Sequence, residues 1–459
     1  MAYFKCKLNK PALSYKCGET IRFSIYARNK CKNIDCDYIR WTLKTDDGKQ
    51  SSGFGSCKAD SPLVVETSLE RPGFAYLNCT AYGESNDPTG AFDVLEAGAG
   101  ADVENILYHD TLPDDFDEYW NDIEKLIENT EIELLQFKEM SDAKKGFNAY
   151  HVMVKTPEGR PSAFTLTVPQ ADGKYPIKLC FMGYGVRPAP VNYFENTITA
   201  SFNAHGMDTT HSGIEVAENY PDIYSGYGFS DADNDSKEKT YYRGMMIRDL
   251  MGLKYLKTLD KWDGKNIISY GGSQGALQAV TVAAHDSSVS FLDVWIPWFC
   301  DLSARSQGYI SGWRPNFKEG LRYFDTAAQG LRVKCPTRIF AGLGDTICPP
   351  ASVMALYNGI KAQKSIQFTQ ARTHGYEPNE LDTYLLSSYD SEIKKGKYRH
   401  FKGNEYEVID IGYDSENESE LVIYKALYGD GKIWVRPIEE FRDFVYRDNK
   451  VMKRFEYIG

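Results

Sequence analysis

A serine set between glycines is the strongest chemical signal in this sequence. Residues 271–275 read Gly-Gly-Ser-Gln-Gly, which fits the pattern Gly-x-Ser-x-Gly with Ser273 at its centre. An apolar segment over 266–270 precedes it, and a segment of small residues over 275–280 follows it. This order predicts a nucleophile elbow, in which glycines permit the strained strand-to-helix turn that lifts the serine hydroxyl above a sheet edge. The alternative is an ordinary glycine turn.

A serine nucleophile needs a histidine base, and in elbows of this kind the chain order is serine, acid, histidine. Three histidines follow Ser273. His285 falls on the elbow helix about three turns away, and His400 lies in a β-rich C-terminal part. We therefore predict that His374, in the loop after a predicted strand over 365–369, is the base.

The carboxylate that orients the base is predicted to be Asp345. It follows an apolar strand over 338–341 and precedes the prolines at 349 and 350, which start another helix. An aspartate at this place can hydrogen-bond the histidine and fix its tautomer. Taken alone, it would be read as a helix cap or a turn residue. Glu377 is the competing acid, but it stands only three residues from His374.

Two backbone N–H groups are expected to hold the oxyanion of an acyl-transfer reaction. One belongs to Gln274, which follows the serine at the start of its helix. The other is assigned to Tyr184, because a predicted strand over 177–182 leads into Gly183-Tyr184-Gly185. A glycine loop after a strand is also an ordinary turn.

Composition bounds the class of protein. The chain has 459 residues, a formal net charge of −11 and a hydrophobic fraction of 42%. An acidic chain does not favour nucleic acid or an anionic membrane as a partner. We find no apolar run near the roughly 20 residues that span a bilayer. Because residues 1–10 lack an apolar signal segment, we expect a cytoplasmic protein.

Ten cysteines are present, and six of them fall in the first 79 residues. Without a secretory leader, reduced thiols buried as small hydrophobic residues are favoured over disulfides. A zinc site formed by Cys31, Cys36, Cys57 and Cys79 is the alternative, although their spacing lacks paired Cys-x-x-Cys knuckles. We expect no cofactor.

The sequence divides into three predicted parts. Residues 1–100 form an all-β sandwich, immunoglobulin-like, with strands over 20–28, 38–44 and 73–82 and a small-residue linker over 96–101. Residues 105–392 alternate strands and helices, which predicts an α/β fold with a mostly parallel sheet covered by helices on both faces. Residues 397–459 form a small β-rich domain.

These motifs resemble the acetyl xylan esterase/cephalosporin C deacetylase family over roughly 105–390. The resemblance rests on the elbow, on Gly344-Asp345 with the two prolines, on His374, and on the segments 114–120, 241–243 and 297–301. It implies an α/β-hydrolase that removes acetyl groups from sugar hydroxyls, with Ser273, Asp345 and His374 as the triad. It also implies that Tyr184 and Gln274 donate the oxyanion-hole N–H groups.

Two family features are absent. Met182 stands where the family usually has a histidine, and Asn203-Ala204-His205-Gly206 replaces an Arg-Gly-Gln signature. The resemblance also implies a homo-oligomer. The C-terminal part, with Tyr398-Arg399-His400-Phe401-Lys402-Gly403, resembles a small family of unknown function.

Two further clusters have both a structural and a functional interpretation. His205, Asp208, His211 and Glu215 are possible metal ligands, but packing under the active site is favoured. Four aromatic residues are expected to be core more often than sugar platforms, namely Trp295, Trp298, Tyr309 and Trp313. Of the aromatic residues, Tyr184 and Trp298 are predicted to contact substrate.

The sequence therefore predicts a serine carboxylesterase that deacetylates a carbohydrate or another small acetyl ester. The first rival is a serine hydrolase acting on a longer acyl chain or a peptide. The second is a non-catalytic carbohydrate-binding protein, because β-rich parts flank the predicted hydrolase.

Overall fold

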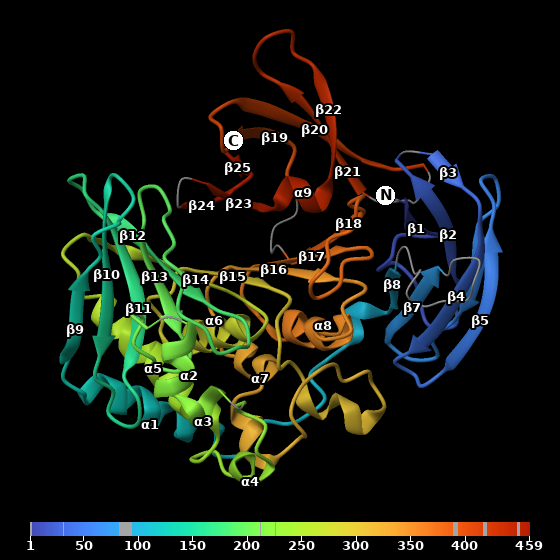
Figure 1. Ribbon diagram of the computed structural model, residues 1–459. Helices are drawn as coiled ribbons and strands as arrows, with labels where there is room; N and C mark the ends of the chain where they lie inside the picture. The colour runs from blue at the N-terminus through green and yellow to red at the C-terminus, as the bar shows by residue number, and fades with distance from the viewer. Residues whose placement is uncertain are drawn as a thin grey trace.

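The structure is a computed structural model that describes residues 2–30, 32–81, 94–211, 213–224, 226–388, 393–415, 420–447 and 450–459. An N-terminal β-sandwich, a large central sheet with helices and a C-terminal sheet follow one another along the chain (Figure 1). The predicted domain boundaries at 100, 105, 392 and 397 are not tested by these sheets and stay a prediction.

Two four-stranded sheets make up the sandwich. One contains β1 (Ala2–Leu8), β2 (Ile21–Asn29), β3 (Lys32–Ile34) and β6 (Leu63–Thr67). The other has the order β5 (Gln50–Cys57), β4 (Cys36–Thr45), β7 (Gly73–Ala81) and β8 (Val94–Ala101). In β2 every second residue is buried, which is the alternation expected when one face of an antiparallel strand meets a core. The three predicted strands correspond to β2, β4 and β7.

The predicted linker over 96–101 is wrong, because these residues form most of β8. That strand pairs antiparallel with β7 along its whole length, and residues 97–101 are buried. Small residues are needed here for close packing, not for flexibility. A β-carbon on Gly98 would lie 2.2 Å from the backbone oxygen of Leu343, and one on Gly100 would lie 2.4 Å from a side-chain carbon of Val103.

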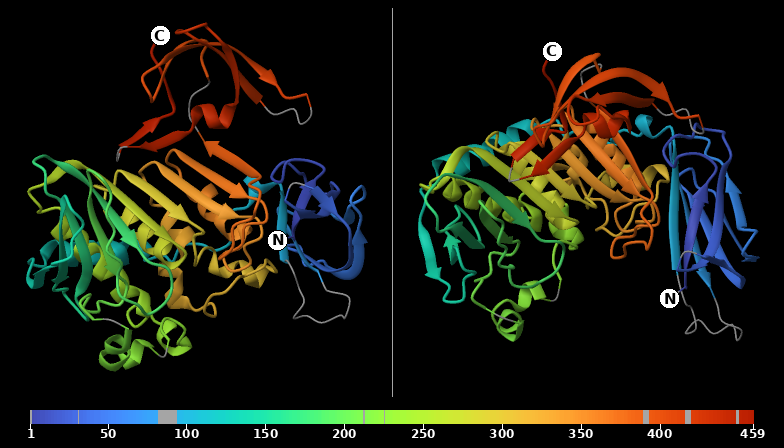
Figure 2. Two further views of the ribbon diagram at one scale, coloured as in Figure 1. Left: turned by 45° about the horizontal axis from the view of Figure 1, so that its top comes forward. Right: turned by 90° about the horizontal axis from the view of Figure 1, so that it is seen from above.

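The sandwich packs against the β16–β18 end of the central sheet (Figure 2). Gln370 joins the two parts: its side chain accepts the N–H of Gly98 at 3.0 Å and donates to the Gly98 oxygen at 2.8 Å. Asp46, which is fully buried, accepts the N–H of Ile310 at 3.0 Å. The sandwich is therefore held directly on the loops of the central part.

The central sheet has ten strands, in the order β18-β17-β16-β15-β14-β12-β13-β11-β10-β9. From β13 through β17 the neighbouring strands are parallel, and β9, β10, β11 and β18 run antiparallel to their neighbours. The central strands are β12 (Tyr175–Phe181), β13 (Ile198–Asn203), β14 (Trp262–Gly272), β15 (Phe291–Trp295), β16 (Thr337–Gly342) and β17 (Lys364–Thr369). The outer strands are β9 (Leu134–Glu139), β10 (Phe147–Val154), β11 (Ser162–Pro169) and β18 (Thr383–Ser388).

The mostly parallel sheet is present as predicted, but the helices of the central part that the structure describes cover one face of it, whereas the sequence predicted helices on both faces. One layer consists of α1 (Phe116–Asn129), α5 (Tyr241–Leu256), α6 (Gln274–His285), α7 (Thr326–Gly330) and α8 (Pro350–Gly359) (Figure 1). Short helices lie between β13 and α5, namely α2 (Gly213–Asn219), α3 (Pro221–Tyr224) and α4 (Asp231–Asn234). The 3₁₀ turns among the described residues of this part are η2 (Val103–Asn105), η3 (Leu302–Gln307) and η4 (Glu319–Tyr323).

The C-terminal part lies over the opposite face, with α9 (Ile438–Arg442) next to β18 (Figure 1). Its sheet contains β22 (Ile433–Pro437), β21 (Glu420–Ala426), β20 (Glu405–Tyr413), β19 (Gly396–His400) and β25 (Phe455–Tyr457). A hairpin of β23 (Phe444–Arg447) and β24 (Lys450–Lys453) is separate.

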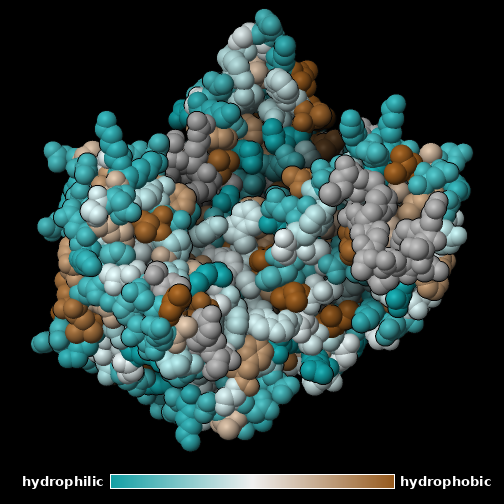
Figure 3. All heavy atoms as spheres, in the orientation of Figure 1, coloured by the Kyte–Doolittle hydropathy of each residue, from teal (hydrophilic) through white to brown (hydrophobic). Residues whose placement is uncertain are grey.

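The face of the molecule seen in Figure 3 is mostly hydrophilic, and its apolar residues form small separate groups. Among the residues that the structure describes, no helix combines the length and the apolar character needed to cross a membrane.

Candidate active site

Ser273 stands in the sharp turn between β14 and α6. Its backbone angles are φ 54° and ψ −121°, a strained conformation for a residue with a side chain. The outer glycines are required by space: a β-carbon on Gly271 would lie 2.2 Å from the Gly275 oxygen, and one on Gly275 would lie 2.3 Å from the Phe181 oxygen. A β-carbon on Gly272 would have its nearest neighbour at 3.7 Å. The predicted elbow is thus present, and two of its three glycines are needed for it.

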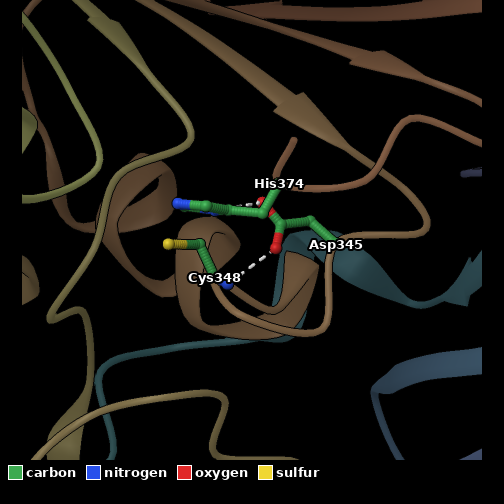
Figure 4. Close-up of side chains that lie close together, drawn as sticks. All are labelled: Asp345, Cys348 and His374. Atoms are coloured by element: carbon green, nitrogen blue, oxygen red, sulfur yellow. Dashed lines mark hydrogen bonds and ion pairs between the residues drawn. The ribbon is translucent and has the colours of Figure 1, made fainter. Parts of the chain in front are cut away.

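Asp345 and His374 come together on the loops after β16 and β17. The Asp345 side chain is fully buried, and its Oδ2 lies 3.0 Å from Nδ1 of His374 (Figure 4). Its Oδ1 accepts the N–H groups of Ile347 at 2.9 Å and Cys348 at 2.8 Å. Because a carboxylate accepts hydrogen bonds, Nδ1 of the neutral imidazole carries the proton and Nε2 is left as the acceptor.

Cys348 links this pair to the elbow. Its thiol and the far end of the His374 ring point to the same side (Figure 4). Burial raises the pKa of the Cys348 thiol well above its usual value, and an interaction with the Ser273 side chain opposes that rise. In the described part of the chain, no hydrogen bond joins Ser273 to His374. Sequence reasoning missed Cys348, although it stands three residues after Asp345.

The competing acid does not reach the base in this structure. Glu377 forms an ion pair with Arg372 at 3.0 Å, and its side chain is 69% exposed. His285, which was excluded as a base, bonds to Glu124 at 2.8 Å and to Gln329 at 2.7 Å on the helical side of the sheet.

The loop after β12 packs against the elbow. A β-carbon on Gly183 would lie 3.7 Å from the β-carbon of Ser273, so the backbone of this loop borders the serine. Tyr184, the next residue, belongs to this loop, and Gln274 begins α6 directly after the serine. That Tyr184 and Gln274 donate the oxyanion-hole N–H groups stays a prediction. The loop over 183–187 is called the oxyanion loop below, after this predicted role.

Tyr227 ties this loop to the start of α6. Its hydroxyl donates to the Gln274 side-chain oxygen at 2.8 Å and accepts the N–H of Gly185 at 3.0 Å. Its ring stacks on Tyr184 with 4.3 Å between centroids and 13° between planes. Tyr227 lies between α3 and α4, and no sequence signal pointed to it.

The segment that replaces the Arg-Gly-Gln signature braces the same loop. The Asn203 amide donates to the Arg187 oxygen at 3.1 Å, and Nη2 of Arg248 donates to the Ala204 oxygen at 2.7 Å. His205 Nε2 lies 3.0 Å from the Gly185 oxygen. The side chains of Asn203 and His205 thus hold the backbone of the oxyanion loop.

His205 is neutral in this environment. Burial lowers its pKa to about 4. Because the Gly185 carbonyl can only accept, Nε2 carries the proton, and Nδ1 accepts the hydroxyl of Tyr241 at 2.5 Å.

The two groups of possible metal ligands that the sequence left as less favoured alternatives are not brought together in the described part of the chain. There, the one group of three or more closely placed metal-ligand side chains is Asp345, Cys348 and His374. Asp208 instead accepts Thr210 and Gln136, while His205 is committed to the oxyanion loop. All described cysteines are free, and Cys31 of the alternative zinc site lies outside the described residues.

The aromatic candidates separate by exposure. Trp298 is 1% exposed, and its indole N–H donates to the Trp313 oxygen at 2.5 Å. Its ring therefore packs beneath the site, and its burial does not favour the predicted substrate contact. Trp313 is 41% exposed and packs edge-on against Tyr184 at 4.8 Å. Tyr309 donates to the Pro72 oxygen within the sandwich contact.

A cleft of about 600 Å³ opens beside the oxyanion loop. Aromatic rings form much of its wall, with Tyr184, Tyr227, Phe229, Tyr241 and Trp313 among its lining residues. Charged groups lie at its edge, namely Arg160, Asp222, Asp233 and Lys239.

A mostly parallel sheet, an elbow serine after one central strand and a buried Asp-His pair after two later strands together define an α/β-hydrolase. The sequence model of the family described as acetyl xylan esterase (AXE1) matches residues 102–307 and 316–387, more than half of the chain. The chain belongs to this family, and it is a carboxylic ester hydrolase. Residues 396–457 match a family described as a protein of unknown function (DUF1653).

The individual proteins to which the chain is similar share a quarter or less of the aligned residues with it, or only slightly more. The chain is 25% identical over 345 residues to the acetyl esterase Axe7A of Xylanibacter ruminicola, covering 71% of this chain and 76% of that protein. An acetyl xylan esterase structure from Paenibacillus sp. R4 is 19% identical, with 60% and 94% of the two chains covered and a TM-score of 0.49. A DUF1653 structure from Bordetella bronchiseptica is 26% identical over 15% of this chain and 90% of that chain, with a TM-score of 0.14.

Proposed function

We propose that this esterase removes acetyl groups from carbohydrate hydroxyls with Ser273 as nucleophile, His374 as general base and Asp345 as the group that orients it. The observation that carries the proposal is the buried Asp345–His374 pair on loops beside the strained elbow. The family match supports acetyl esters as the substrate class.

In the first half of the reaction, Nε2 of His374 takes the Ser273 proton while the serine oxygen attacks the acetyl carbonyl carbon. The N–H groups of Tyr184 and Gln274 hold the oxyanion that forms. As the tetrahedral intermediate collapses, the bond to the sugar oxygen breaks and His374 returns its proton to that oxygen. The products are a free sugar hydroxyl and acetyl-Ser273.

In the second half, water enters where the sugar left. His374 takes a proton from the water as its oxygen attacks the acetyl carbon, and the same N–H groups hold the second oxyanion. The proton then goes to the Ser273 oxygen as the ester bond breaks, which releases acetate. Throughout, the buried Asp345 carboxylate stabilises the imidazolium.

The aromatic cleft beside the oxyanion loop is the place for the sugar. Phe229 is 36% exposed and Trp313 is 41% exposed, and their ring centroids lie 5.0 Å apart. Exposed aromatic faces beside polar groups suit a sugar ring, which has apolar faces and a polar rim. We therefore assign the sugar contact to Trp313 together with Tyr184.

The test compares rates on the 4-nitrophenyl esters of acetate, butyrate and octanoate and on acetylated xylo-oligosaccharides. We expect acetyl esters to be hydrolysed fastest, Ser273→Ala to abolish turnover, and Ser287→Ala, a change at an exposed serine after the elbow helix, to leave it intact. Faster hydrolysis of octanoate favours the long-acyl rival. Sugar binding without Ser273-dependent turnover favours the binding-protein rival.

We also propose a homo-oligomer, on the basis of the family resemblance alone. Light scattering of the purified chain gives the molar mass, and a value near the 52.0 kDa of one chain contradicts this proposal.

A further inference from the structure

A second pocket lies between the sandwich and the central part, and the proposed reaction does not use it. Its volume is about 400 Å³, within the range of about 300 to 1,000 Å³ usual for ligand sites. The sandwich contributes Thr42, Lys44, Tyr76, Leu77, Asn78, Glu96 and Ala97, and the central part contributes Ile310, Ser311, Gly312, Gly344 and Thr346. These residues belong to the two parts that Figure 2 shows side by side.

This pocket shares a wall with the catalytic loop. Gly344 and Thr346, which line it, are the two neighbours of Asp345 in the chain. The loop is packed directly on β8, because a β-carbon on Gly344 would lie only 2.0 Å from the Glu96 oxygen. The same loop carries Cys348, whose thiol interacts with the Ser273 side chain. The pocket and the serine are thus separated by the width of one loop.

The segment over 310–313 also borders both the pocket and the aromatic cleft. Ile310, Ser311 and Gly312 line the pocket, and the next residue, Trp313, lines the aromatic cleft. The N–H of Trp313 donates to the Ile347 oxygen at 3.1 Å, which fastens this segment to the catalytic loop. One short segment therefore separates the pocket from the aromatic cleft.

The polar groups of the pocket suit a neutral ligand with many hydroxyls. Lys44 is exposed and has no ion pair within the described part of the chain, so its ammonium is available as a donor. Glu96 is half-buried, and it accepts the Asn78 amide at 3.3 Å. The charge of the Lys44 ammonium is balanced by the Glu96 carboxyl group, so the pocket favours neither an anionic nor a cationic ligand. Hydroxyls of Thr42, Ser311 and Thr346 add donors and acceptors around them.

We propose that this pocket is a subsite for a further sugar ring of an acetylated oligosaccharide, and that the sandwich supplies it. The inference rests on the proposed function, since it names the form of that substrate. The ring that carries the acetyl group stacks in the aromatic cleft, and a further ring of the same chain, beyond the segment over 310–312, binds Lys44 and Thr42. The sandwich then sets a preference for chains over single sugars.

The test uses the full chain and two substrates, acetylated xylotetraose and 4-nitrophenyl acetate. For each variant the readout is the ratio of kcat/KM for the tetrasaccharide to that for the small ester. We expect Lys44→Ala to lower this ratio about tenfold, the loss typical of a hydrogen bond to a charged group, and Thr42→Val to lower it less. Lys32→Ala, which changes an exposed lysine on β3 of the other sheet, is the matched control.

A binding measurement separates recognition from turnover. Calorimetric titration of Ser273→Ala with deacetylated xylotetraose should give a Kd that Lys44→Ala weakens about tenfold. If both subsite variants keep the wild-type ratio and Kd while their melting temperatures are unchanged, the subsite does not exist. If the wild-type chain fails to hydrolyse 4-nitrophenyl acetate, the proposed function fails instead.

Discussion

The backbone oxygen of Glu96 occupies the place that a side chain on Gly344 would need. A β-carbon built on Gly344 lies 2.0 Å from that oxygen, so strand β8 of the sandwich is packed directly on the loop that carries Asp345. The N-terminal sandwich therefore helps to support the loop that carries Asp345, through backbone atoms that cannot rotate away as a side chain could.

Gly344→Ala should disturb the catalytic acid. Neither backbone can yield locally, so the loop must shift, at a cost of about 1 to 3 kcal/mol in the free energy of unfolding and with a fall in kcat. Gly375→Ala is the matched control on the neighbouring loop, since a β-carbon there has no atom within 4 Å among the described residues. Melting curves and kcat on 4-nitrophenyl acetate check both. Equal behaviour of the two variants would show that the contact does not support the site.

Asp345→Asn should lower kcat by about 10⁴-fold, because an amide in place of the carboxylate favours the wrong tautomer of the base. Glu377→Gln should keep wild-type kcat, since Glu377 pairs with Arg372 and does not contact His374. Steady-state kinetics on 4-nitrophenyl acetate measures both variants. A large loss in Glu377→Gln with activity retained in Asp345→Asn would reverse the assignment of the acid.

Tyr227→Phe should lower kcat by about ten- to a hundredfold while KM changes little. The change removes the hydroxyl that joins the Gly185 N–H to Gln274, so the oxyanion donors lose alignment in the transition state. Tyr220→Phe, which loses a hydrogen bond from the Asp208 N–H in the same region, should keep kcat. A rise in KM alone would mean that Tyr227 acts on substrate binding and not on the oxyanion hole.

Acid should destabilise the fold through His205. Burial lowers its pKa to about 4, whereas an unfolded histidine titrates near about 6.5. Its neutral form thus contributes stability above pH 6.5, and this contribution is lost as the pH falls toward 4. When the pH falls from 7 to 4.5, the free energy of unfolding should decrease in both proteins. The decrease should be smaller in His205→Gln than in the wild type, by up to about 3 kcal/mol. Denaturant titrations at both pH values measure this difference, and titrating groups that both proteins share cancel in the comparison. An equal loss of unfolding free energy in the variant and the wild type would contradict the prediction.

The nucleophile elbow and the Asp-His pair were predictable because their chemistry imposes local patterns. Glycine is needed at 271 and 275, because a side chain there would collide with neighbouring backbone. Asp345 and His374 each follow a strand that is visible in the sequence as an apolar run. Their chain order then removes most alternatives. Family resemblance added the substrate class but no contact geometry.

The remaining features depend on packing between distant segments. Alternating alanine and glycine at 97–101 looks like a linker, yet residue 98 must be a glycine because the Leu343 backbone lies against it. Tyr227 reaches Gln274 only after the chain has passed through several short helices. The exposure that distinguishes Trp313 from the buried Trp298 is likewise a property of the folded chain.

The central claim is that Ser273 is an activated nucleophile, and covalent labelling tests it most directly. The folded full-length chain is incubated with a fluorophosphonate near neutral pH, and the labelled peptide is identified by mass spectrometry. The account predicts stoichiometric labelling at Ser273 that disappears in Ser273→Ala and is strongly slowed in His374→Ala. A folded chain that shows no labelling, or labelling at another serine, would contradict it.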